Sequence, residues 1–476
     1  MKYIPTFVAL FMLITVCKAQ MESTDLNKKI DAYVGTISER NGIPGAAVAV
    51  VKDGKILHKA YYGNANLEHD VPVTSKSIFR VYSLTKTVVA TAVFQLLEQK
   101  QLSLEDKVAI YIDDIPEAWG DIQLKHLLTH SSGLPDMAPI MDFENLTEVE
   151  ARDKVFGQPL RFQFGTRYDY NQTNFWLLQR IIEKVTEEKI EDFIFQGQFW
   201  DVTDSTVFLS SDSRDIVSHR VTPYFPFRNG KLIIDNSYLQ GRYMLSANGL
   251  NLTLEDYIQW NAKFEQNQLI GQATKDNMFK LFAYIEADKA FAYGWDSREL
   301  NGHASYGFSG SLVTAYRIFP EDNMSIIFLS NGLEHYYDIE NVINHLASFV
   351  NEDIYDANNE VFEDLLAKAI DRNTDEMLNH YRVLKDDSHF ETVNFESILN
   401  NIGYVLLRLE HPKKALKVFE LNTNEYPNSW NVWDSLAEGH EHLGDTKNAI
   451  HNYEKSLILN PDNKHAVERL KALRAK

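Results

Sequence analysis

Cysteine is almost absent from this chain, long apolar runs are few, and positive charge is in deficit. The single cysteine is Cys17, so the rest of the chain can form neither disulfides nor thiolate metal sites. The formal net charge of −20 at pH 7 would repel nucleic acid and anionic membrane surfaces, and we expect neither as a partner. Beyond the N-terminal segment no stretch reaches the roughly 18 apolar residues of a membrane-spanning helix, so we expect no integral membrane segment in the mature chain.

The N-terminus has the pattern of an export signal. Lys2 precedes an apolar run that ends at Val16, and the small Ala19 follows it. These features predict a secretory signal peptide over residues 1–19 and an exported protein, either periplasmic or secreted. Lipid anchoring through Cys17 is the alternative, but Val16 is bulkier than the small residue that precedes the cysteine in lipoprotein signals.

Residues 24–350 alternate strand-like and helix-like stretches. Two β-rich runs in "GAAVAVVKDGKILHKAYYG" are joined by Asp53-Gly54, a pair typical of a two-residue hairpin turn. Helical patterns cover residues 83–99 and 174–187, and strand patterns return in "GSLVTAYRIF" and "MSIIFLSN". Strands on either side of a block of helices predict an α+β domain, an antiparallel sheet packed with helices.

Residues 358–476 lack strand patterns and become helical. An alanine, an aromatic residue and a proline each recur 34 positions later, as Ala415 and Ala449, Phe419 and Tyr453, and Pro427 and Pro461. This resembles the tetratricopeptide pattern, in which small residues let paired helices approach and a proline closes each unit. We expect an all-α domain with repeats over about 396–429 and 430–463 and then a capping helix. Such stacks form concave surfaces that can bind a protein partner, although this one could equally brace the neighbouring domain.

The stretch "RVYSLTKTVV" puts Ser83 three residues before Lys86 at the head of an apolar helix. Residues at i and i+3 share a helix face, so the hydroxyl and the amine would be within contact reach. A serine is a weak nucleophile until its proton is removed, and a lysine can remove it only where burial or another cation lowers its pKa. Ser83 is therefore a candidate nucleophile and Lys86 a candidate base, although Ser-x-x-Lys alone also occurs on many surface helices.

Two later stretches supply groups that this pair would need. Tyr170 stands in a polar loop before an amphipathic helix in "FGTRYDYNQTNFWLLQRIIEKV", where it could be a proton shuttle or a core tyrosine. The stretch "HASYGFSGSLVTAYRIFPEDNMSIIFLSN" is a Gly-rich approach to a β-strand. A strand edge of this kind can offer a backbone N–H to an oxyanion, as acyl transfer requires.

With these stretches in order, residues from about 25 to 331 resemble the serine β-lactamase and penicillin-binding family, in particular its class C, D-alanyl-D-alanine carboxypeptidase and esterase branch. Further support comes from "GIPGAAVAVVKDGK", "HLLTHSSGLPD" and "NGLNLTLEDYIQW". The resemblance implies Ser83 as the acylated nucleophile, Lys86 as its proton acceptor and Tyr170 as a proton relay. It also implies an oxyanion hole that includes the Ser83 N–H, and no metal or organic cofactor.

The second motif of the chain departs from the family pattern. That motif usually reads Tyr-Ser-Asn or Tyr-x-Asn, and here Gln172 stands in place of the asparagine. Glutamine keeps the amide on a longer arm. A carboxamide in this position can still hydrogen bond a substrate carbonyl, so the change is compatible with activity.

The third motif departs more strongly, because it usually reads Lys-Thr-Gly or His-x-Gly. The preferred alignment places Phe308, Ser309 and Gly310 there, which makes the Ser311 N–H the second oxyanion donor. The alternative is Ser305–Gly307, which lacks a cation too. Without that cation a free substrate carboxylate would not be clamped, and neither penicillins nor peptides ending in D-alanine would be held well.

His126 and His130 stand at i and i+4, the spacing of two zinc ligands. A zinc hydrolase of the His-Glu-x-x-His kind needs a glutamate after the first histidine, where this chain has Leu127. We therefore expect a structural role, with His130 hydrogen bonded to the turn "SSGLP".

These patterns lead to three hypotheses for function. The first is an exported serine hydrolase that forms an acyl-enzyme on Ser83, an esterase or amide hydrolase acting on a small molecule, peptide or ester. The second is a D-alanyl-D-alanine carboxypeptidase or β-lactamase with the same chemistry. The third is an inactive binding module that uses its helical repeats, against which the joint presence of Ser83, Lys86 and Tyr170 argues.

Overall fold

The computed structural model describes most of the chain from residue 25 to 475. The residues that it leaves out within that range are 142–145, 204, 227–231, 236–240, 287–288, 335–337 and 372–373. The predicted signal peptide and Cys17 lie outside the described residues. Among the described helices, none is long and apolar enough to cross a membrane.

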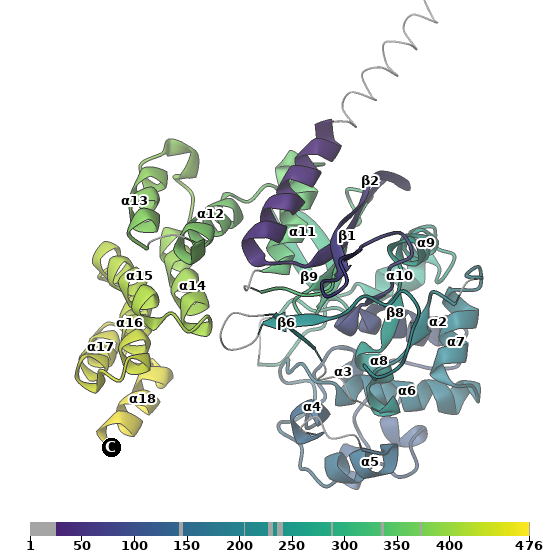
Figure 1. The fold of residues 1–476 in the computed structure, drawn as a ribbon. Helices are drawn as coiled ribbons and strands as arrows, with labels where there is room; N and C mark the ends of the chain where they lie inside the picture. Colours follow the sequence, from purple (N-terminus) through teal and green to yellow (C-terminus); the bar gives the residue numbers. More distant parts are fainter. Residues whose placement is uncertain are drawn as a thin grey trace, which may run out of the picture. The chain divides into compact units, whose positions relative to one another are not determined.

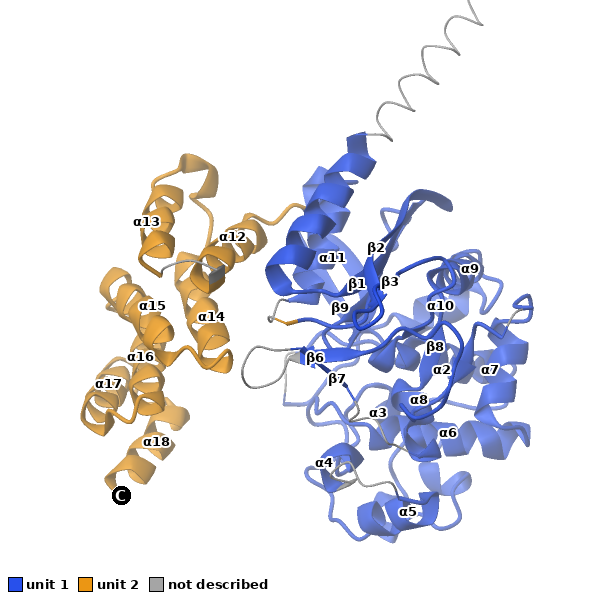
Figure 2. Cartoon of the chain, viewed as in Figure 1, with its two compact units in different colours: residues 1–225, 232–333, 337–354 blue, residues 226–231, 334–336, 355–476 orange. Residues whose placement is uncertain are grey.

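The chain forms two compact units, coloured separately in Figure 2. Unit 1 holds most of the described residues up to Ile354, and unit 2 holds those from Tyr355 onward. Each unit has its own buried apolar clusters. The two are therefore described separately.

A seven-stranded antiparallel sheet forms the middle of unit 1 (Figure 1), with strand order β3-β2-β1-β12-β11-β10-β9. Its strands are β1 (Gly45–Lys52), β2 (Lys55–Asn66), β3 (Val71–Pro72), β9 (Asp296–Leu300), β10 (His303–Gly310), β11 (Thr314–Phe319) and β12 (Met324–Ser330). Asp53 and Gly54 join β1 to β2 with φ values of 51° and 68°. Positive φ at both positions is the geometry of a two-residue hairpin turn, so this prediction is confirmed.

Helices cover both faces of this sheet, because successive residues of the buried central strands point to opposite sides. Val48 and its same-face neighbours pack against the helix over residues 25–41 and against α11 (Ile339–Ser348). Ala49 and its same-face neighbours pack against α2 (Thr85–Glu98), α6 (Thr173–Thr186) and α9 (Leu254–Glu265). The α+β fold expected from the sequence is confirmed.

The remaining elements of unit 1 are short. The small strands are β4 (Phe79–Arg80), β5 (Phe208–Leu209), β6 (Tyr224–Pro226), β7 (Leu232–Ile234) and β8 (Leu250–Leu252). The further helices are α3 (Leu124–Leu128), α4 (Met137–Met141), α5 (Glu148–Phe156), α7 (Ile190–Gln198), α8 (Leu245–Asn248) and α10 (Gln272–Met278). The 3-10 turns are η1 (Tyr82–Leu84), η2 (Val108–Ile110), η3 (Glu117–Trp119), η4 (Arg242–Met244) and η5 (Glu352–Ile354). Strand β4 pairs with β8, which brings the chain to the start of α2.

Unit 2 consists of helices in its described part. They are α12 (Ala357–Asp371), α13 (Thr374–Lys385), α14 (Phe395–Arg408), α15 (Pro412–Glu425), α16 (Trp430–His442), α17 (Thr446–Leu459) and α18 (Lys464–Arg474), with the 3-10 turn η6 (Ser388–Phe390) between α13 and α14. Pro427 and Pro461 each stand two residues after a helix, and Ala415 and Ala449 are both fully buried. These features suit helix pairs that repeat every 34 residues, and the assignment to the tetratricopeptide family stays a prediction.

Candidate active site

Ser83 lies in a tight turn between β4 and α2. The residue before it, Tyr82, has a φ of 49°, in the left-handed region that ends regular right-handed helix. The long helix therefore begins at Thr85, two residues later than the predicted start, and Ser83 sits in η1 immediately before it. Lys86 follows in the first turn of α2, and its Nζ is 3.4 Å from Ser83 Oγ. The expected contact between the two side chains is present.

Tyr170 reaches the same point from the loop that precedes α6. Its hydroxyl oxygen is 2.7 Å from Ser83 Oγ. Burial raises the pKa of Tyr170 to about 12, against the opposite effect of its hydrogen bonds with Ser83 and Gln172. The phenol therefore keeps its proton at neutral pH, which suits a relay between two other groups better than a base.

Lys86 is fully buried, and its ammonium group has mainly neutral partners. Its Nζ donates to Gln172 Oε1 at 2.8 Å and to the main-chain oxygen of Ala247 at 2.7 Å. It forms no ion pair with any residue that the structure describes. Burial lowers the pKa of Lys86 to about 7, with the nearby Asp136 acting in the opposite direction. A substantial fraction of this amine is thus neutral, and able to accept a proton, at neutral pH.

The end of β10 passes directly beside the Ser83 turn. A Cβ atom added to Gly310 would lie only 2.3 Å from the main-chain oxygen of Val81, so only glycine fits there. The Phe308 ring is 6.0 Å from the Tyr170 ring, centre to centre. Ser309 pairs with Ala315 in the strand register, and Ser311 follows the strand with a φ of 49°.

The alternative third motif, Ser305–Gly307, lies further back along the same strand. There Tyr306 stacks on Phe279 at 4.3 Å, and the Ser305 hydroxyl bonds to the main-chain oxygen of Arg298. The geometry therefore favours Phe308–Gly310 as the segment beside Ser83. Phe308 therefore belongs to the strand segment that passes beside Ser83 and Tyr170.

His130 holds the loop that carries Tyr170. Its main-chain oxygen accepts the Asp169 N–H at 2.8 Å, and its Nδ1 accepts the Asn171 N–H at 3.3 Å. One residue thus binds the chain on both sides of Tyr170. The prediction that His130 is hydrogen bonded to the turn "SSGLP" was wrong. Its ring nitrogen Nδ1 is hydrogen bonded to Asn171 and Asn174 instead.

The His130 ring is also fixed in its neutral form. Asn174 accepts a hydrogen bond from the Ser132 hydroxyl through Oδ1, so its amide nitrogen is the group 3.0 Å from His130 Nδ1. Nδ1 must then carry a lone pair and Nε2 the proton. Burial, with a further contribution from Lys86, holds the pKa of His130 well below its usual value. His126 lies elsewhere, with its Nδ1 accepting the Gln123 N–H at the start of α3.

Asp136 is a residue of the site that the sequence analysis did not single out. Its Oδ1 accepts the Gln172 N–H at 2.9 Å and the Ala138 N–H at 3.2 Å. Burial raises its pKa, while these two hydrogen bonds and Lys86 act in the opposite direction. Asp136 therefore fixes the main chain at Gln172, whose side chain in turn binds Lys86.

Solved structures show the same fold. A penicillin-binding protein homologue from Pyrococcus abyssi superposes with a TM-score of 0.62 at 20% identity, over 72% of this chain and 81% of that one. A D-amino acid amidase from Ochrobactrum anthropi superposes with a TM-score of 0.58 at 19% identity, over 69% of this chain and 98% of that one. EstCE1, described as a hydrolase with promiscuous acyltransferase activity, has a TM-score of 0.57 at 17% identity, over 71% and 100%.

Residues 28–347, more than half of the chain, match the family model described as Beta-lactamase. The chain therefore belongs to the β-lactamase family of serine hydrolases. Among its relatives, penicillin-binding protein 4* of Bacillus subtilis is 23% identical over 64% of this chain and 72% of its own length. A D-aminopeptidase of Gluconobacter oxydans is 27% identical over 60% of this chain, and the match spans 52% of that protein.

Proposed function

We propose that this chain is an exported serine hydrolase that is acylated on Ser83 and cleaves esters or amides with a neutral acyl group. One observation carries the proposal: Ser83 Oγ lies 2.7 Å from the Tyr170 hydroxyl and 3.4 Å from the nitrogen of a buried lysine. The pattern over residues 1–19 is the support for export.

In acylation, neutral Lys86 takes the Ser83 proton, directly or through the Tyr170 hydroxyl, as Oγ bonds to the substrate carbonyl carbon. The N–H groups of Ser83 and Ser311 are the donors proposed for the oxyanion. When the tetrahedral intermediate collapses, the bond from carbon to the leaving oxygen or nitrogen breaks. The proton held by Lys86 passes through Tyr170 to that leaving atom.

Deacylation repeats these steps with water. The same amine takes a proton from the water as its oxygen bonds to the acyl carbon. The bond from that carbon to Ser83 Oγ then breaks, and Oγ recovers a proton as the acid product leaves. Gln172 helps to direct Lys86 at Ser83: its Oε1 accepts one hydrogen of the neutral amine and the Ala247 oxygen accepts the other, which leaves the lone pair for the Ser83 proton.

The Phe308 ring favours substrates without a charged acyl group. It occupies the place beside Tyr170 where a cation would clamp a substrate carboxylate. The names of the relatives support two branches of the same chemistry: the amidase and EstCE1 suit the proposal, whereas the penicillin-binding proteins suit a D-alanyl-D-alanine carboxypeptidase or β-lactamase. The latter is the second candidate function.

The experiment is a labelling and turnover panel on the full chain beside Ser83→Ala. A fluorophosphonate should add to the wild type on Ser83, as intact mass and peptide mapping would show, and should leave Ser83→Ala unlabelled. A short-chain aryl ester should be turned over faster than a chromogenic cephalosporin. The reverse order would favour the second candidate. A folded wild type that forms no adduct with a fluorophosphonate or a fluorescent penicillin would instead favour a binding module acting through its helices.

A further inference from the structure

A cavity of about 540 Å³ opens in unit 1 away from Ser83. On β11, Thr314 bonds to Val81 next to the Ser83 turn, whereas Ile318, four residues along, lines the cavity. Four residues of strand span about 13 Å, so the cavity lies at the other end of this strand. The turn residues Asp53 and Asn323 also line it and are joined by a backbone hydrogen bond of 2.8 Å. Its volume falls within the range of small-molecule sites.

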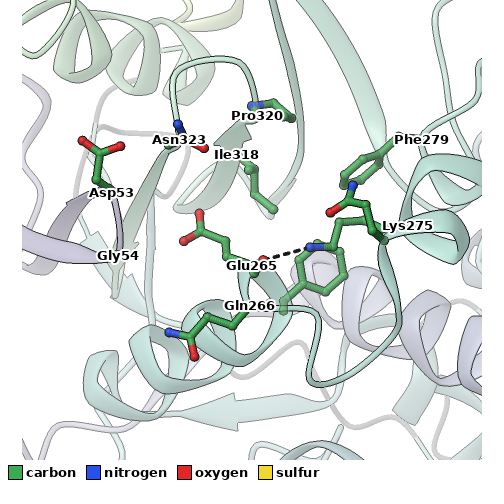
Figure 3. Close-up of a pocket in the computed structure, with 11 residues that line it drawn as sticks. Asp53, Gly54, Glu265, Gln266, Lys275, Phe279, Ile318, Pro320 and Asn323 are labelled. Carbon is green, nitrogen blue, oxygen red and sulfur yellow. Dashed lines mark hydrogen bonds between the residues drawn. The ribbon is translucent and has the colours of Figure 1, made fainter.

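Lys275 of α10 is a buried cation that lines this cavity, with its amine directed at the main chain of Glu265 (Figure 3). It is only 7% exposed, and its Nζ donates to the main-chain oxygen of Glu265 at 3.2 Å. No residue in the described part of the chain forms an ion pair with it. Burial lowers the pKa of Lys275 to about 8, with the charges of Glu265 and Asp276 acting in the opposite direction.

The buried Lys263 of α9 shows what the usual compensation looks like. It is 6% exposed, close to the value for Lys275, and it forms an ion pair with Asp201. A buried cation is costly unless an anion accompanies it. At Lys275 the chain supplies the cation and the space beside it, but no paired anion.

The other residues that line the cavity indicate what kind of ligand would fit it. Phe279, Ile318 and Pro320 form an apolar side. Burial raises the pKa of the Glu265 carboxyl, which also lines the cavity. A single cation beside two acidic residues, Glu265 and Asp53, suits a singly charged anion better than a dianion.

We propose that this cavity binds a small organic monocarboxylate, with the carboxylate paired to Lys275 and an apolar ring or chain against Phe279, Ile318 and Pro320. The site is separate from Ser83 and does not rest on the proposed hydrolysis. The acid products of such a hydrolysis and acids from outside sources share this chemistry.

Isothermal titration of the full chain with phenylacetate tests the proposal. Saturable binding at one site is expected, with the neutral phenylacetamide at least about tenfold weaker because it lacks the charge that pairs with Lys275. Equal affinity for phenylacetate and phenylacetamide would contradict the proposal, and so would no saturation by phenylacetate up to about 10 mM, a concentration at which even the weak sites of small ligands fill.

Three variants locate the site. Lys275→Met removes the charge at similar length and should weaken phenylacetate binding at least about tenfold without loss of fold, because an apolar group replaces an unpaired buried cation. Lys280→Met, at an exposed lysine two residues past α10, is the matched control and should bind as the wild type does. Ser83→Ala should also bind normally. Binding that survives Lys275→Met, or that disappears in Ser83→Ala, would place the carboxylate elsewhere and overturn the proposal.

Discussion

The two units use their lysines in different ways. In unit 2, Lys414 donates to the main-chain oxygens of Ala369 and Ile370 at the end of α12, which ties two helices together. In unit 1, Lys86 donates to one main-chain oxygen, one amide and one serine hydroxyl. Burial lowers the pKa of Lys86 to about 7. The Lys414 amine instead satisfies two carbonyls at a helix end.

Lys414 thus has a structural role in unit 2, whereas Lys86 belongs to the candidate active site of unit 1. Buried polar groups in unit 2 join helices, as where Asn463 donates to Asp434 at 2.8 Å and Asn422 to the main-chain oxygen of Glu396 at 3.0 Å. In unit 1, four groups with displaced pKa values, Lys86, His130, Asp136 and Tyr170, lie together around Ser83. Strongly perturbed groups that converge in this way mark functional sites.

The largest expected effect comes from exchanging the two lysines for methionine. Lys86→Met should lower kcat for an aryl ester by about 1,000-fold or more, because the serine loses its general base. Lys414→Met should leave kcat within about twofold while it lowers the unfolding temperature, since two helix-end carbonyls lose a donor. Steady-state kinetics and thermal melts on both variants check this. A Lys86→Met variant with more than a tenth of the wild-type rate would contradict the comparison.

A glycine pair gives the next largest contrast. Gly310→Ala should cut hydrolysis about 100-fold, because its new Cβ would press on the Val81 oxygen and displace the Ser83 turn. Gly403→Ala would place a Cβ 2.2 Å from the Phe419 ring of unit 2. It should cost about 1–3 kcal/mol of unfolding free energy and leave the rate unchanged. If both substitutions affected only stability, the segment at Gly310 would have no part in positioning Ser83.

A smaller effect is expected at His130. His130→Phe removes the acceptor for the Asn171 N–H and should lower kcat about tenfold with less change in KM. The reason is that the loop carrying Tyr170 loses one of the two hydrogen bonds that fix it to His130. His130→Asn places a side-chain oxygen near the position of Nδ1 and tolerates the φ of 52° found there, so it should recover much of the rate. Equal losses in the two variants would indicate a packing role only.

The pH dependence of kcat/KM should show the titration of the buried Lys86 amine. The neutral form is the base, so kcat/KM should rise with pH through an inflection near 7 and level off above it, an increase of about tenfold between pH 6 and pH 8. Asp136 raises the pKa of Lys86, so Asp136→Asn should move the inflection to lower pH. An inflection that stays in place would mean that another group is the base. Lys86→Arg, whose guanidinium stays charged, should show no rise.

The smallest effect is expected from removing unit 2. A chain that ends at Ile354 keeps both apolar clusters of unit 1 and should hydrolyse the aryl ester within about threefold of the full chain, because each unit has its own core. Circular dichroism would establish that the shortened protein is folded. If it is folded but inactive, the helices of unit 2 contribute to the site.

Local signals in the sequence predicted much of the fold. The Asp53-Gly54 turn, the helix after Tyr170 and the strands β11 and β12 are all encoded within a few residues, by turn chemistry and by apolar periodicity. The spacing of Ser83 and Lys86 predicted their contact for the same reason. The start of α2 was misplaced because the left-handed backbone at Tyr82 has no signature in residue type.

Contacts between distant segments could not be predicted from the sequence. His130 and Asn171 are 41 residues apart, and no local pattern around either residue predicts their hydrogen bond. Gly310 meets Val81 only because β10 is held in the sheet at one register, and register is a property of the whole sheet. The lowered pKa of Lys86 likewise depends on burial by distant segments of the chain, one of which, α8, also supplies the Ala247 oxygen that the amine bonds to.

The pairing of β1 with β12 has a consequence for how the molecule is made. Ala49 lies opposite Ile327, so the central seam of the sheet joins an early strand to a very late one. Such long-range pairing slows folding, and a growing chain on the ribosome cannot close this seam until β12 has emerged. Unit 2 is the reverse case, since its helices pair with sequence neighbours and can form as they appear. A pause or truncation during synthesis before β12 should therefore expose the half-made sheet to aggregation or proteolysis, whereas one within the last helices should spare unit 1.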